Sequence, residues 1–170
     1  MPMIDPTTLS EPELEAMLHT WAHGSHSSEA AVNLVINART WLPRADFRRE
    51  CMVAITDAVQ LGAHLPMATI RWAAAARYAE HATASRSETA LLRLACSLAG
   101  VHTGSLREFT APLDPTDTAR LIDALAHRDG WHTSGISHTT DGSQGAPDLA
   151  ARSAAQQSER RRTVVHPHHL

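Results

Sequence analysis

Lysine is absent from this sequence of 170 residues, and all fifteen basic side chains are Arg. Chemistry that needs a lysine amine is therefore excluded, which removes Schiff-base catalysis and the lysine-containing loop that cradles phosphates. Aromatic residues make up only 4% of the chain. The core must therefore consist mainly of Ala, Leu, Val, Ile and Met, with the four Trp as its few large side chains.

Cysteines and long apolar runs are also scarce. Cys51 and Cys96 are the only two cysteines, and both lie among apolar residues, so we expect them to be buried and reduced. The N-terminus has no charged segment followed by an apolar run, and no stretch of the sequence approaches the length that crosses a bilayer. The sequence therefore predicts a cytoplasmic protein that does not associate with membranes.

The charge is nowhere strongly basic. Residues 1–130 hold eleven Arg against fifteen Asp and Glu, a balance of −4, and residues 131–170 hold four Arg against three acidic residues, a balance of +1. Neither part attracts a phosphate backbone over a distance. We therefore expect no nucleic-acid partner on the basis of overall charge.

The length and the distribution of apolar residues predict one folded domain. A chain of this size buries a core without disulfides or a structural metal. After Trp131 the sequence consists mostly of polar residues, and such a composition cannot recover its ordering entropy by burial. We predict a mainly α, compact multi-helix domain over residues 1–130 and a polar, disordered C-terminal tail over residues 131–170.

Capping boxes give the clearest helix starts. Ser10 with Glu13, and Ser85 with Glu88, place a hydroxyl and a carboxylate at the spacing that caps a first turn reciprocally. Glycine in the left-handed conformation ends many helices. The two expected helices end at Gly24 and Gly100.

Other signals predict the remaining helices. Asp114 before Pro115 is a cap followed by a proline, and the helix it begins ends at Gly130. Asp46 is expected to cap a turn that begins at Phe47. Further helices are expected over residues 29–39, 72–83 and, as a short turn, 104–109.

Residues 51–71 admit two interpretations. The apolar residues fit a helical stripe, but residues 51–56 and 67–71 can instead pair as a short β-hairpin. A glycine and a proline interrupt the segment, and the β-branched residues at 69–70 favour a strand. The hairpin is the favoured interpretation.

Three elements carry a family resemblance. Ile70-Arg71-Trp72 precedes an expected helix, residues 85–88 form a cap, and the sequence LRLACSLAG occupies residues 92–100. Together they resemble a family of uncharacterised small proteins from high-GC Gram-positive bacteria, from about Trp41 to Gly130. Position 71 has Arg where the family pattern has an acidic residue. The resemblance implies the hairpin and attaches no activity to the chain.

Three histidines are the candidate metal ligands. His19 and His23 lie one helical turn apart, and His26 follows closely, so three imidazoles could surround Zn²⁺ or Ni²⁺. No carboxylate or thiolate lies at a matching spacing, and histidines near a helix C-terminus interact favourably with the last carbonyl groups. We therefore predict no bound metal and no cofactor.

The sequence favours an interaction protein over an enzyme. It lacks Gly-x-Ser-x-Gly, His-Glu-x-x-His and Cys-x-x-Cys. We predict a non-enzymatic regulatory module of unknown pathway that binds another protein or itself, and the interaction candidates are Arg77, Arg86 and Arg93. The alternative is a DNA-binding regulator that uses the helix pair 72–83 and 86–99. An enzyme or metal protein whose site forms only in three dimensions is the third possibility.

Overall fold

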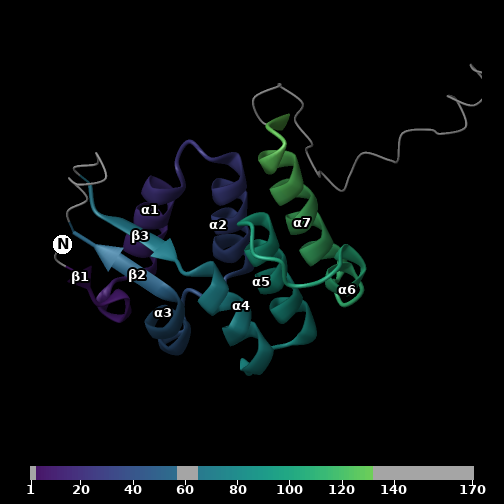
Figure 1. The fold of residues 1–170 in the computed structure, drawn as a ribbon, viewed down its shortest axis with the longest axis horizontal. Coiled ribbons are helices and arrows are strands. Elements are labelled where there is room, and N and C mark those ends of the chain that lie inside the picture. The colour runs from purple at the N-terminus through teal and green to yellow at the C-terminus, as the bar shows by residue number, and fades with distance from the viewer. Residues whose placement is uncertain (1–2, 57–64, 132–170) are drawn as a thin grey trace, which may run out of the picture. The chain divides into compact units, whose positions relative to one another are not determined.

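The structure, a computed structural model, describes residues 3–56 and 65–131, which form a mainly helical fold with one small antiparallel sheet (Figure 1). The helices are α1 (Glu11–Ala22), α2 (His26–Ala38), α3 (Ala45–Cys51), α4 (Trp72–His81), α5 (Arg86–Leu98), α6 (Leu106–Thr110) and α7 (Pro115–Arg128), with a 3-10 helix, η1 (Pro6–Thr8), before α1. The strands are β1 (Met3–Ile4), β2 (Met52–Ile55) and β3 (Met67–Ile70). The prediction of a mainly α fold with one hairpin is confirmed. Apart from Trp131, the predicted tail lies outside the described residues.

The predicted capping boxes form as expected. The Ser10 N–H donates to Glu13 Oε2 at 2.8 Å, and the Ser85 N–H donates to Glu88 Oε2 at 2.7 Å. Asp114 caps α7 by accepting a hydrogen bond from the backbone N–H of Asp117 at 2.8 Å. Because each contact joins residues three positions apart, the sequence alone determines it.

Three predicted helix starts were wrong. The short helix expected over residues 104–109 is α6, which begins at Leu106 because Ser105 caps it. Helix α2 begins at His26 instead of residue 29, since Ser25 caps it. Asp46 does not cap α3, because the helix already begins at Ala45 and its N-cap residue, Arg44, makes no side-chain cap. The Asp46 carboxylate instead accepts hydrogen bonds from other side chains, as described below.

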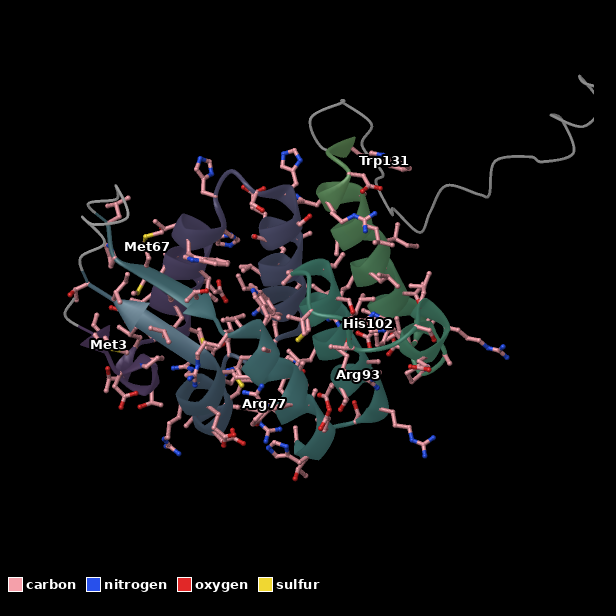
Figure 2. The ribbon with its side chains drawn as sticks, in the orientation of Figure 1. Met3, Met67, Arg77, Arg93, His102 and Trp131 are labelled. Atoms are coloured by element: carbon pink, nitrogen blue, oxygen red, sulfur yellow. The ribbon has the colours of Figure 1, made fainter. Side chains whose placement is uncertain are left out.

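The predicted hairpin consists of β2 and β3, which pair in antiparallel register from Met52↔Ile70 to Ile55↔Met67. Strand β1, which the sequence analysis did not predict, adds to the other edge of β2 and brings Met3 opposite Ile55. Met3 and Met67 therefore flank Ile55 on the two sides of β2 (Figure 2). The buried face of the sheet packs against α1.

Helix α2 lies at the centre of the helical part and packs against α1, α5 and α7. Beside it, the rings of Trp41, Phe47 and Tyr78 contact one another, with centroids 5.5–6.0 Å apart. Cys51 and Cys96 are buried and free, as predicted. Most of the remaining core consists of Ala, Leu and Val, in agreement with the composition.

A buried arginine ties three segments together. The Arg48 guanidinium, on α3, is only 7% exposed and donates hydrogen bonds to the carbonyl oxygens of Leu42 and Leu9. These bonds satisfy backbone groups that would otherwise be buried without partners. None of the helices in the described ranges combines the length and apolar character needed to cross a bilayer.

Candidate functional site

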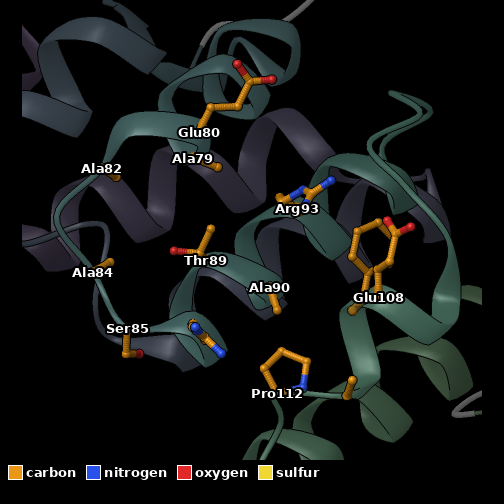
Figure 3. Close-up of a pocket in the computed structure, with 13 residues that line it drawn as sticks. Ala79, Glu80, Ala82, Ala84, Ser85, Thr89, Ala90, Arg93, Glu108 and Pro112 are labelled. Atoms are coloured by element: carbon orange, nitrogen blue, oxygen red, sulfur yellow. The ribbon is translucent and has the colours of Figure 1, made fainter.

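A groove of about 670 Å³ lies between the end of α4, helix α5 and helix α6 (Figure 3). Small and apolar side chains provide much of its lining: Ala79, Ala82, Ala84, Ala90, Phe109, Ala111 and Pro112. Because alanine side chains are short, a bound chain can approach the helix backbones closely. The volume of the groove lies in the range of sites that bind small ligands or short stretches of chain.

Helix α5 forms one wall of this groove. Arg86, Thr89, Ala90 and Arg93 line it, and spacings of three, four and seven residues place them on one face of the helix. In Figure 3, Thr89 and Ala90 lie between the Ser85 end of the groove and Arg93. At a rise of 1.5 Å per residue, Arg86 and Arg93 begin about 10 Å apart along the helix axis.

The side chain of Arg93 is held in place by the loop that follows α5. Its guanidinium donates to the carbonyl oxygen of Thr103 and lies over the ring of Phe109, 5.5 Å from the centroid. The hydroxyl of Thr103 donates to the Arg93 carbonyl oxygen at 2.8 Å. The Arg93 side chain is therefore half-buried, and these contacts fix the position of its guanidinium.

Gly104 makes this close approach possible. Its φ is +149°, and a Cβ at this position would lie 2.5 Å from Glu108 Oε2 and 3.1 Å from an Arg93 guanidinium nitrogen. Any other residue would strain the backbone and displace these two side chains.

A second hollow, of about 370 Å³, shares Glu80 and Arg93 with the groove. It also contacts Arg77 and His102, which Figure 2 shows on the same side of the molecule as Arg93. The three predicted interaction candidates, Arg77, Arg86 and Arg93, thus all line these two hollows. We call the hollows together the arginine groove.

The arginine groove has more positive than negative side chains. Arg77 and Arg86 are exposed, and neither they nor Arg93 form an ion pair with any carboxylate in the described residues. The lining carboxylates are Glu80 and Glu108, and Glu108 Oε2 already accepts the Ser105 N–H at 3.3 Å as part of a third capping box. Three arginines against two glutamates give this site a net charge of +1, whereas residues 1–130 have a balance of −4.

A cluster around Arg44 stabilises the segment that connects α4 to α5 and lines one part of the groove. Arg44 donates to the Thr83 carbonyl oxygen and pairs with Asp46, each at 2.8 Å, and its guanidinium lies 5.7 Å from the Tyr78 ring centroid. The Tyr78 hydroxyl donates to Asp46 at 2.7 Å. The Arg44 and Tyr78 hydrogen bonds hold the pKa of Asp46 well below its usual range, and burial raises the pKa of Tyr78. This cluster fixes the segment between Ala82 and Ala84.

The candidate metal ligands are not brought together as a set. His23 Nδ1 lies 3.8 Å from Glu29 Oε1, and the His26 ring packs edge-on against His127, with centroids 6.1 Å apart. His19 is exposed near the C-terminus of α1, where its carbonyl oxygen accepts the N–H of His23. Within residues 3–56 and 65–131, no group of three or more His, Cys, Asp or Glu could hold a metal ion.

Sequence reasoning missed the partners of these histidines. His127 Nε2 lies 2.8 Å from Glu29 Oε2, and this hydrogen bond holds the pKa of Glu29 below its usual value. The two residues are 98 positions apart, so no local pattern indicates the pair. They join α2 to α7.

The two thiols are not positioned for nucleophilic chemistry. Burial raises the pKa of both Cys51 and Cys96 to about 12, so both stay protonated near neutral pH. A nucleophilic cysteine reacts as the thiolate and lies where a reactant can reach it.

Comparisons with known proteins identify no relative. No protein-family model matches the chain, and neither a curated protein nor a solved structure is significantly similar to it. The family resemblance drawn from residues 70–72, 85–88 and 92–100 therefore stays a prediction. The interpretation of the site rests on its geometry and charge.

Proposed function

We propose that the protein is a non-enzymatic interaction module that binds a segment of another protein in the arginine groove. The observation that carries this proposal is the convergence of Arg77, Arg86 and Arg93 on two adjoining hollows, with no carboxylate of the described residues paired to any of them. Arginine is enriched at the energetic centres of protein interfaces, where it combines charge, planar hydrogen bonding and packing area.

The chemistry of the lining supports binding over catalysis. An arginine stays protonated and cannot exchange protons at neutral pH. Two other polar groups of the lining take part in helix caps: the Ser85 hydroxyl accepts the Glu88 N–H, and Glu108 accepts the Ser105 N–H.

We also propose that the module acts in the cytoplasm. Two free, buried thiols are typical of a reducing compartment, where disulfides rarely persist. The DNA-binding alternative has less support, because Glu80 and Glu108 line the surface that the helix pair α4 and α5 would present to phosphates.

Photo-crosslinking tests the proposed function. A photoreactive residue replaces Thr89, which lies in the groove, and a matched control replaces Asp123, which is exposed on α7. Irradiation in the native host should yield discrete protein adducts from position 89 and not from position 123. Equal yields from both positions, or none from position 89, would reject the groove. An adduct of twice the mass of this chain would assign the groove to self-association and reject a separate partner.

A further inference from the structure

We propose that the segment bound in the arginine groove is acidic. Its carboxylates pair with Arg86 at one end and with Arg77 and Arg93 at the other, and small apolar side chains cover the alanines between them. This inference rests on the proposed function, because it specifies the chemistry of the partner in the same groove.

Charge complementarity indicates an acidic occupant. Three arginines outside the groove, Arg44, Arg120 and Arg128, each pair with an aspartate at 2.6–2.8 Å. The other five in the described ranges form no ion pair there: Arg39, Arg48, Arg49, Arg71 and Arg107. The arginines of the groove have no such partner in the part of the chain that the structure describes, and Arg93 is already oriented by Thr103 and Phe109. A carboxylate matches the planar donors of a guanidinium in a bidentate arrangement. A partner can therefore supply the anions that the chain itself does not.

A short extended segment is long enough to span the groove. An extended chain advances about 3.3 Å per residue, so about three residues bridge Arg86 and Arg93.

A nucleic acid also carries anions, but the surroundings of the groove disfavour it. Glu80 lines both hollows and repels an acidic peptide as well as a phosphate backbone, so the two anions differ in length and not in this contact. The acidic balance of residues 1–130 would repel a long polyanion further, whereas a short peptide contacts only the groove. The test below therefore compares binding of a DNA duplex with binding of the acidic peptide.

The test measures binding of a labelled peptide of alternating Glu and Ala to the full chain by fluorescence anisotropy at low salt. A peptide of alternating Gln and Ala is the matched control. We expect the acidic peptide to bind about ten-fold more tightly than its control and to weaken as salt increases. The double substitution of Arg77→Gln and Arg86→Gln should weaken binding of the acidic peptide by about ten-fold.

Two single substitutions control for charge. Arg49→Gln removes an exposed arginine of α3 outside the groove and should leave the affinity unchanged. Glu80→Gln removes the lining carboxylate that repels the peptide and should tighten binding by about two- to five-fold. A gain of affinity cannot result from misfolding, so this variant keeps the test informative even if other variants lose stability.

The outcomes separate the inference from the proposed function. Equal affinity for the two peptides, or no binding of either, overturns the acidic occupant. If position 89 still crosslinks to a protein in that case, the interaction module stands and only the chemistry assigned to its partner is wrong. Tighter binding of a labelled DNA duplex than of the acidic peptide, lost in the double variant, overturns the inference in favour of a nucleic acid.

Discussion

Arg44 and Arg93 perform the same mechanical task in different electrostatic settings. Each guanidinium lies over an aromatic ring and donates to the carbonyl oxygen of a loop, Thr83 for one and Thr103 for the other. Arg44 also pairs with Asp46 at 2.8 Å, whereas Arg93 has no carboxylate within ion-pair distance among the described residues. One arginine is thus neutralised within the fold, and the other keeps its charge at a groove.

This difference separates a structural arginine from one that can bind a ligand. A paired guanidinium has its charge satisfied, so its removal costs stability and little else. An unpaired guanidinium at a groove contributes to recognition once a partner supplies the anion. The predictions below test this distinction by altering each cluster in turn.

Gly104→Ala should have the largest effect, because it strains the backbone and displaces Arg93. We expect a loss of about 1–3 kcal/mol in the free energy of unfolding, measured by denaturant titration. Gly24→Ala is the matched control, since its φ is +85° and no atom lies within 4 Å of the added Cβ. Both variants strain the backbone, but only Gly104→Ala should also weaken binding of the acidic peptide. Equal binding by the two variants would show that the loop does not orient Arg93.

Arg44→Met should cost about 1–2 kcal/mol of unfolding free energy, because the Thr83 carbonyl oxygen and Asp46 lose their partner. Methionine keeps much of the packing against Trp41 and Tyr78, so the loss reports the polar contacts. Thermal and urea unfolding measure it. An unchanged free energy of unfolding would mean that Arg44 does not stabilise the segment between α4 and α5.

Acid titration should distinguish the two clusters. The pKa of Asp46 in the folded protein lies below its ordinary value of 3.8 because Arg44 and Tyr78 donate to it. A lowered carboxyl pKa contributes stability that is fully present above that value and is lost as the pH falls toward the folded-state pKa. Unfolding free energy measured from about pH 5 to pH 2 should therefore fall less steeply in Asp46→Asn than in the parent protein. Arg86→Gln should leave the slope unchanged, and an altered slope would reveal an unseen carboxylate partner.

The smallest effect on stability is expected for Arg77→Gln and Arg86→Gln. Both side chains are exposed and make no hydrogen bond or ion pair with the described residues, so each substitution should change the unfolding free energy by less than about 0.5 kcal/mol. A larger loss in urea unfolding would contradict the separation between structural and binding arginines.

Local signals allowed much of the helical framework to be predicted. The boxes at Ser10 and Ser85, and the cap at Asp114, depend on atoms within one turn, and each forms in the structure. The wrong prediction that Asp46 caps α3 also came from a local signal. Asp46 resembles a cap by residue type, but Arg44 and Tyr78, the latter 32 positions away, engage its carboxylate.

Contacts between residues far apart in the sequence could not be predicted. Strand β1 contains two residues and pairs with β2 about fifty positions later, so no periodicity marks it. The sequence did indicate Arg77, Arg86 and Arg93 as interaction candidates. It could not indicate that α6 and Thr103 enclose Arg93, because that contact depends on how the chain turns at Gly104.

The burial of the two native cysteines makes the chain a convenient host for site-specific dyes. Maleimide reagents need an accessible thiolate, so a single cysteine introduced at an exposed position such as Arg107 should react while Cys51 and Cys96 stay unmodified. A fluorophore on α6 could then report peptide binding without removal of either native cysteine. Slow reaction of Cys51 and Cys96 themselves would measure the rate at which the core opens.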